Sequence, residues 1–187
     1  MATAAVLAGG AGSRLGGAKA TALLRGRPLI QHVLDAVRAG GLEAVVVAKA
    51  DSPLPPLDVP VLIEPDEPRH PLCGVVTALR ELREAAVIVC ACDMPFVPAA
   101  LFAWLAAQDD ELAVTSAGGE LQPLLGRYSA SLLGRLEAAL AEGHSMRDVT
   151  RQLGARVIGA AELERFGDPV RICSSINTPE ELARAGG

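Results

Sequence analysis

Aromatic residues and positive charge are both scarce in this sequence. It holds one Trp, one Tyr and three Phe in 187 residues, too few for the stacking platforms on which single-stranded nucleic acids are bound. Lys and Arg number 17 against 22 Asp and Glu, which gives a formal net charge of −5. An acidic chain lacks the usual attraction to a phosphate backbone. These two shortages argue against a nucleic-acid partner.

Cysteines are few, and long hydrophobic runs are missing. Cys73, Cys90, Cys92 and Cys173 form no CxxC pair and have no His nearby at zinc-binding spacing, so we expect buried free thiols in a reducing compartment. No apolar stretch approaches the ~20 residues of a membrane span. The first residues, MATAAVLAGG, lack the basic segment of a signal peptide. The sequence therefore predicts a cytoplasmic protein with no membrane partner.

Half of the residues are apolar, enough for the core of one domain over residues 1–187. Apolar runs alternate with helical patterns. Strands are predicted at 3–8, 43–48, 59–64, 86–91, 112–116, 121–127, 156–158 and 170–173; helices are predicted at 28–39, 72–84, from 98, at 129–141, at 144–153 and from 179. This alternation predicts an α/β fold, a three-layer sandwich around a mostly parallel, Rossmann-like sheet. The run 86–91 is the most apolar, so we expect it at the centre.

A long glycine-rich loop follows the first predicted strand, at the sheet edge where ligands bind. Five glycines surround two cations in this loop: Gly9, Gly10, Gly12, Gly16 and Gly17 surround Arg14 and Lys19. Backbone N–H groups freed by glycine, a forked guanidinium and an ammonium suit phosphate oxygens. A P-loop is excluded because Ala20 follows Lys19, and a dinucleotide fingerprint because Leu15 replaces its last glycine. A plain glycine turn with two solvated cations is the alternative.

The segment LAGGAGSRLGGAK resembles the signature loop of nucleotidyltransferases, and most of all that of the molybdenum cofactor guanylyltransferases. Leu15 stands where that family has Met, and Ala18 where it has Asp. Four further segments resemble family motifs in the same order over almost the whole chain: RHPLCGVVTAL, with His70 in place of a Gly, VCACDMPFVP, ELQPLLGRYSASLL and SSINTPEEL. The resemblance implies that family's fold, a Mg²⁺ cofactor and its substrates.

The resemblance also implies roles for individual residues. Nucleotide binding falls to Leu7, Ala8, Gly9, Gly10, Gly12, Ser13, Arg14, Lys19, Asp66, Gly74 and Asp93, and acceptor binding to Gln122, Pro123 and Asn177. Arg14, Lys19 and Asp93 would be catalytic, with Mg²⁺ on Asp93. The residues themselves support the metal, because a carboxylate at a strand end beside a phosphate loop is a natural Mg²⁺ ligand. A turn-forming Asp is the other reading of Asp93.

Several of these roles have competitors. Glu64 and Glu67 flank Asp66 and compete with it for the nucleoside. Ala48 and Lys49 follow the second predicted strand, where the family often has Asn, which leaves base recognition open. Asn177 could instead cap the helix that begins at Pro179. His70 is read as a loop histidine rather than a base.

The implied reaction is transfer of GMP from GTP to molybdopterin, with release of pyrophosphate, and it leaves room for contacts with cofactor-biosynthesis or acceptor enzymes. The alternatives are cytidylyl transfer to the same pterin, transfer to a sugar phosphate or phospholactate, and a nucleotide-binding module without turnover. Members that use CTP tend to have LAAG, so Gly9 favours GTP. We expect the backbone at Ala8 and Gly9 to face the base, so that a Cβ at position 9 would press on it.

Overall fold

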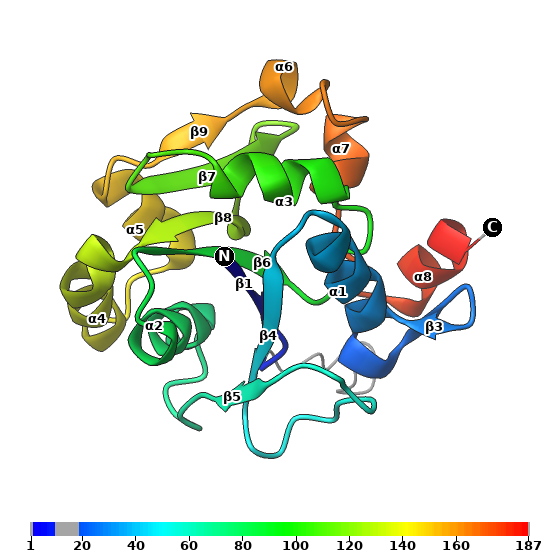
Figure 1. Ribbon diagram of the computed structural model, residues 1–187, viewed down its shortest axis with the longest axis horizontal. Helices are drawn as coiled ribbons and strands as arrows, with labels where there is room; N and C mark the ends of the chain where they lie inside the picture. The colour runs from blue at the N-terminus through cyan, green and yellow to red at the C-terminus, as the bar shows by residue number, and fades with distance from the viewer. Residues whose placement is uncertain (1, 10–18, 187) are drawn as a thin grey trace.

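The computed structural model describes residues 2–9 and 19–186. Within them, strands form one seven-stranded sheet in the order β5-β4-β1-β6-β8-β7-β9 (Figure 1). The bounds of the strands are β1 Thr3–Leu7, β4 Glu43–Ala48, β5 Val61–Ile63, β6 Ala86–Ala91, β7 Leu112–Ala117, β8 Glu120–Ser129 and β9 Arg156–Ile158. The apolar strand β6 lies fourth of the seven, which confirms its predicted central position.

Strand direction agrees with the predicted mostly parallel sheet. β1 pairs in parallel with β4 and with β6, β4 pairs in parallel with β5, and β7 pairs in parallel with β9. β8 runs antiparallel to both β6 and β7, so it is the single reversed strand of the described sheet. The carboxyl ends of β5, β4, β1 and β6 therefore meet in a row at one edge.

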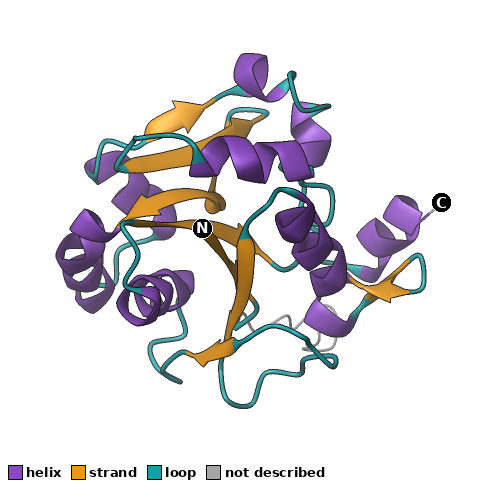
Figure 2. Ribbon diagram, in the orientation of Figure 1, coloured by secondary structure: helices purple, strands orange, loops and turns teal. Residues whose placement is uncertain are grey.

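Helices cover both faces of the sheet and make the three layers (Figure 2). On one face lie α1 Leu29–Ala39 and α3 Ala99–Ala106, and on the other lie α2 Pro71–Leu82, α4 Leu133–Ala141 and α5 Met146–Gln152. Alternate side chains of a strand point to opposite faces: Ala4 and Val6 of β1 join the core under α1, whereas Ala5 and Leu7 join the core under α2. Both faces of β1 are buried, as its unbroken apolar sequence predicted.

The predicted strand at 170–173 is wrong. These residues belong to the short helix α7 Pro169–Ile172, which Asp168 caps by accepting a hydrogen bond from the Val170 N–H at 3.0 Å. Asp before Pro is a helix-start signal, and it outweighs the apolar run. Helix 129–141 begins instead as a 3₁₀ turn, η3 Ala130–Leu132.

Four small elements were not predicted. They are the 3₁₀ turn η2 Lys19–Thr21, the hairpin of β2 Leu23–Leu24 and β3 Arg27–Pro28, and α6 Ala160–Leu163. Arg25 and Gly26 both have positive φ, 52° and 76°, as a two-residue hairpin turn requires. The last helix, α8 Pro179–Gly186, packs beside this hairpin through Leu24 and Leu182.

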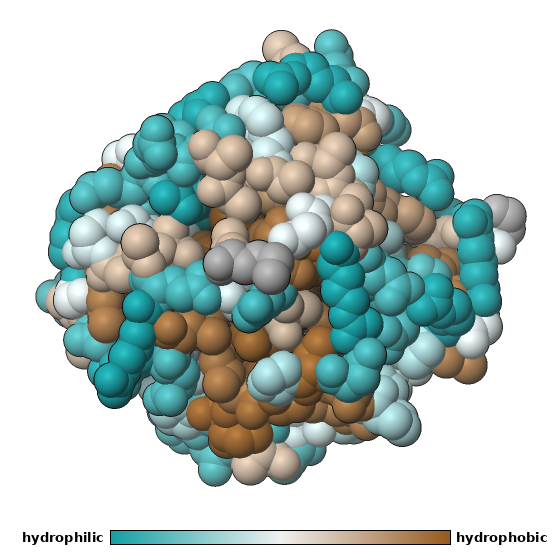
Figure 3. Space-filling model, in the orientation of Figure 1, coloured by the Kyte–Doolittle hydropathy of each residue, from teal (hydrophilic) through white to brown (hydrophobic). Residues whose placement is uncertain are grey.

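The four cysteines are free and buried, which confirms the expectation of buried thiols. Among the described residues, no helix is long and apolar enough to cross a membrane. The short edge strand β5 leaves Val61 and Ile63 exposed, and Figure 3 shows apolar side chains gathered low on this face, in the region of β5.

Candidate functional site

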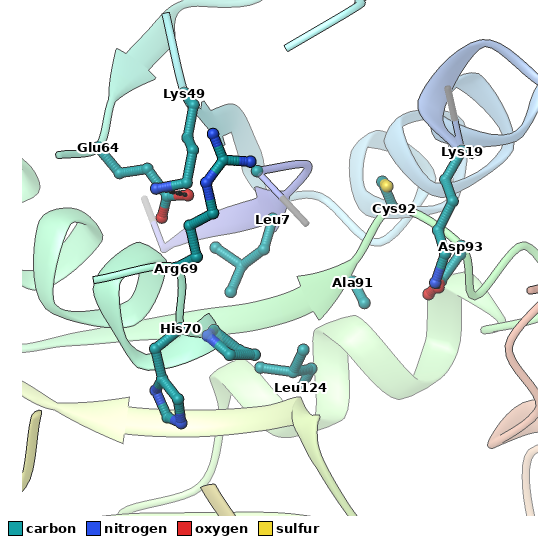
Figure 4. A pocket seen from close by; sticks show the side chains of 12 residues that line it. Leu7, Lys19, Lys49, Glu64, Arg69, His70, Ala91, Cys92, Asp93 and Leu124 are labelled. Carbon is teal, nitrogen blue, oxygen red and sulfur yellow. Dashed lines mark hydrogen bonds and ion pairs between the residues drawn. The ribbon is translucent and has the colours of Figure 1, made fainter. Parts of the chain in front are cut away.

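A cavity of about 390 Å³ opens at the carboxyl ends of β5, β4, β1 and β6. Each of these strands contributes to its wall the residue that comes one or two positions after its end: Glu64, Lys49, Gly9 and Asp93. The sheet order changes direction between β1, which connects to β4, and β6 on its other side. Such a switch point is where open α/β sheets bind ligands. Charged groups stand at two ends of the cavity (Figure 4).

One end is built around Lys19 and Asp93. Lys19 Nζ lies 2.8 Å from Asp93 Oδ2 and also donates to Asn177 Oδ1. Asp93 is buried at the end of β6, and Lys19 comes from η2, directly after the glycine-rich loop. Three segments distant in the sequence thus meet at one point, as the predicted roles of Lys19 and Asp93 require.

Asn177 faces this end and does not cap α8. The cap is made by Thr178, whose Oγ1 accepts from the Glu181 N–H at 3.2 Å, while Glu181 Oε2 accepts from the N–H groups of Asn177 and Thr178. This reciprocal pair is a capping box. The Asn177 side chain is thereby free to hold Lys19. The Ile176 N–H, which donates to Asp93 O at 2.8 Å, fastens the segment in place.

The other end holds a buried ion pair. Lys49 Nζ lies 3.4 Å from Glu64 Oε1, and their side chains are 5% and 6% exposed. Lys49 Nζ also donates to Pro65 O at 2.5 Å. The Glu64 N–H still pairs with Ala48 O at 2.9 Å, which extends the β4–β5 ladder and brings the two residues together. Burial raises the pKa of Glu64, and the Lys49 charge opposes that rise.

Two glycines make room for the Glu64 carboxylate. A Cβ on Gly9 would lie 1.9 Å from Glu64 Oε1, and a Cβ on Gly74 would lie 3.1 Å from Glu64 Oε2. Gly9 lies two residues after the end of β1, and Gly74 lies in α2 next to the Leu7 side chain. A methyl group at position 9 would therefore meet Glu64; that it would also press on a base stays a prediction.

Asp66, which the resemblance assigned to the nucleotide, is exposed and does not line the cavity. Its competitor Glu67 is exposed as well, and Glu64 is the acid of this loop that faces the cavity. Sequence reasoning treated Lys49 only as a missing Asn. The signal for both residues was their position directly after a predicted parallel strand, since that places a side chain at the ligand-binding edge.

His70 is a helix cap, in agreement with its reading as a loop histidine. Its Nδ1 accepts from the Leu72 N–H at 3.2 Å at the start of α2, and its ring lines the cavity. Burial lowers the pKa of His70. A lower pKa favours the neutral imidazole, in which Nδ1 can accept the hydrogen bond from the Leu72 N–H.

The remaining predicted residues fall into three groups. Gln122 and Pro123 lie on β8 next to Leu124, which lines the cavity although they do not. Leu7 lines the cavity. Ala8 is buried, and its N–H donates a hydrogen bond to Val47 O at 2.8 Å. The predicted residues Gly10, Gly12, Ser13 and Arg14 lie outside the described residues.

The donor set suits a Mg²⁺ ion shared with a substrate. No group of three His, Cys, Asp or Glu that could hold a metal occurs in the described part of the chain. Mg²⁺ needs no such cage, because it commonly takes one or two carboxylates together with substrate phosphates and water. Asp93 supplies one carboxylate at the cavity wall, where such phosphates could reach it.

Comparison with known proteins gives one consistent family. Residues 4–157 match the MobA-like NTP transferase domain. Two curated relatives are called molybdenum cofactor guanylyltransferase: one from Cereibacter sphaeroides is 35% identical, covering 96% of this chain and 93% of the relative, and one from Pseudomonas entomophila is 32% identical, covering 95% and 94%.

Solved structures have the same architecture. The molybdopterin-guanine dinucleotide biosynthesis protein A from Archaeoglobus fulgidus superposes with a TM-score of 0.82 at 25% identity, over 98% of this chain and 96% of its own. The 2-C-methyl-D-erythritol 4-phosphate cytidylyltransferase from Thermus thermophilus superposes with a TM-score of 0.69 at 21% identity, over 100% and 98%. The second likeness is one of fold alone.

Proposed function

This chain belongs to the MobA-like NTP transferase family, and from that premise we propose that it is a molybdenum cofactor guanylyltransferase. It transfers GMP from GTP to molybdopterin and releases pyrophosphate, with Mg²⁺ as cofactor. Four buried thiols suit a reducing compartment, so we place this activity in the cytoplasm.

The observation that carries this proposal is the meeting of Lys19, Asp93 and Asn177 at one end of the cavity. A carboxylate and an ammonium side by side can serve a metal and a phosphate at once. A plain glycine turn with solvated cations does not need Lys19 to be held by two partners from other segments.

The reaction needs no nucleophile from the protein. The terminal phosphate of the acceptor has a second pKa of about 6 and is therefore largely a dianion at neutral pH. Its oxygen forms a bond to the α-phosphorus of GTP, and the bond from that phosphorus to the bridging oxygen of pyrophosphate breaks. Positioning and neutralisation of charge supply the catalysis.

Lys19 and Arg14 neutralise the charge that gathers on the phosphates and on the departing pyrophosphate. Lys19 would exchange its contact with Asp93 for phosphate oxygens, while Asn177 keeps its ammonium within reach. Asp93 would hold Mg²⁺, which when bound supplies positive charge to the phosphate oxygens. The backbone from Leu7 to Gly12 would carry the nucleotide, and Gln122 and Pro123 are proposed to contact the acceptor.

The test is a direct assay. Purified protein is incubated with molybdopterin, Mg²⁺ and either GTP or CTP, and the dinucleotide product and pyrophosphate are measured by chromatography. We expect product from GTP in clear excess over CTP. Preferential use of CTP would overturn the guanylyl assignment, and binding of nucleotide without product would point to a module without turnover.

A further inference from the structure

Glu64 carries a nearly buried carboxylate that faces the cavity. Its side chain is 6% exposed and lines the cavity. Among the described residues, its partner is Lys49 at 3.4 Å. A carboxylate can accept about four hydrogen bonds, and one ion pair with Lys49 does not occupy all of them. The carboxylate therefore has oxygens available for a ligand in the cavity.

This carboxylate lies at the end of the cavity away from Asp93. Glu64 follows β5 and Asp93 follows β6, and β4 and β1 lie between these strands. At about 4.8 Å per strand, the ends of β5 and β6 are roughly 14 Å apart, and the Glu64 side chain reaches from β5 toward Gly9, which follows β1. Figure 4 shows Glu64 and Lys49 on one side, Lys19 and Asp93 on the other, and Leu7 and Ala91 between them. With phosphates at Asp93, an extended nucleotide places its base near Glu64.

The pair matches one base edge in particular. The Watson–Crick edge of guanine carries the O6 acceptor followed by two donors, N1–H and N2–H₂. A carboxylate can accept from both donors at once, and an ammonium can donate to O6. Cytosine and adenine offer one donor beside an unprotonated ring nitrogen, which would face the second carboxylate oxygen. Of the three N–H donors of Lys49, Pro65 O and Glu64 use two, so one remains.

We propose that Glu64 and Lys49 together read the guanine edge, with Glu64 accepting from N1–H and N2–H₂ and Lys49 donating to O6. This inference rests on the proposed function, because it takes the phosphates to lie at Asp93. Gly9 and Gly74 leave the space that the Glu64 carboxylate occupies, because a side chain at either position would crowd it.

The test compares nucleotide affinities rather than turnover. Dissociation constants of GTP, ITP, XTP and CTP are measured by calorimetry with Mg²⁺ and without acceptor, for the wild type, Glu64→Gln and Glu67→Gln. Glu67 lies on the same loop, and its side chain is 76% exposed, so Glu67→Gln is the matched control. ITP lacks the N2–H₂ donor, and XTP has an oxygen there instead.

We expect the wild type to bind GTP about 10-fold to 100-fold more tightly than ITP, the usual effect of one hydrogen bond to a charged group. In Glu64→Gln, the amide oxygen can still accept from N1–H while the amide N–H₂ donates to O2 of xanthine. This variant should therefore prefer XTP to GTP. Glu67→Gln should keep the wild-type ranking.

Equal binding of GTP and ITP by the wild type would overturn the inference without any variant, and so would a Glu64→Gln protein that keeps the wild-type ranking. In both cases a preference for GTP over CTP would leave the proposed function standing. A wild type that prefers CTP would instead refute the proposed function itself. Thermal unfolding of Glu64→Gln checks that the variant is folded. The comparison of GTP with ITP uses the wild-type protein alone, so it tests the inference even if the variant does not fold.

Discussion

Replacing Gly9 by Ala tests the packing around Glu64 most directly. The new Cβ would lie 1.9 Å from Glu64 Oε1 and 2.8 Å from Glu64 Cδ, whereas ordinary contacts begin at 3.4 Å. The carboxylate must therefore move by about 1.5 Å, the difference between 3.4 and 1.9 Å. Its partner Lys49 is buried as well. Moving the carboxylate therefore weakens a buried ion pair at a place where water cannot readily solvate the separated charges.

The expected loss of stability follows from these contacts. Overpacking a buried site typically costs ~1–3 kcal/mol, and the lower chain entropy of Ala in the unfolded state returns about 0.4–1 kcal/mol. We expect a net loss of about 1.3 kcal/mol in the free energy of unfolding. For a chain of 187 residues, that lowers the Tm by about 3–5 °C.

Urea and thermal unfolding of four proteins form the assay: wild type, Gly9→Ala, Glu64→Ala and the double variant. Without the Glu64 carboxylate, the nearest atom to the new Cβ is Lys49 N at 3.5 Å, an ordinary contact. Gly9→Ala should then cost at most about 0.5 kcal/mol in the Glu64→Ala background. The matched control is Gly134→Ala, where a Cβ meets nothing within 4 Å and the stability should not fall.

An equal cost of Gly9→Ala in both backgrounds would refute this account, because the clash would then not involve Glu64. The nucleotide preference of Gly9→Ala provides a second test. A displaced Glu64 cannot serve guanine, so Gly9→Ala should lose more kcat/KM with GTP than with CTP, by roughly 1–3 kcal/mol.

Three further predictions concern the reaction itself. Asp93→Ala should abolish Mg²⁺-dependent turnover while the far-UV circular dichroism stays native; wild-type rates would remove Asp93 from the mechanism. Lys19→Ala should lower kcat by about 10²–10³ with a smaller change in GTP affinity, because a cation at the leaving group acts mainly in the transition state; a pure loss of affinity in steady-state kinetics would make Lys19 a simple binding residue. Because burial raises the pKa of Glu64 above 4.5 and guanine needs the ionised form, GTP affinity should fall on acidification at a higher pH than an exposed glutamate would give, and Glu64→Gln should lack this dependence in calorimetric titrations.

Local sequence determined the elements and the general place of the site. Near-continuous apolar runs such as 86–91 encode buried parallel strands, and the glycine-rich loop and Asp93 stand directly after two of them. Because the carboxyl ends of parallel strands meet at one edge, those residues could be assigned to a common site without coordinates. The helix at 169–172 was predicted as a strand, because four residues are too few to show a helical periodicity that outweighs their apolar pattern.

The tertiary structure alone decided which side chains face the cavity. Glu64, Asp66 and Glu67 are alike in charge and nearly adjacent, yet only the first continues the β-ladder and turns inward. Asn177 was a cap or a ligand until Thr178 and Glu181 proved to form the cap. The direction of a loop side chain depends on what packs against it from distant segments, here β4, α2 and the end of the chain, and that information is not contained in a local pattern.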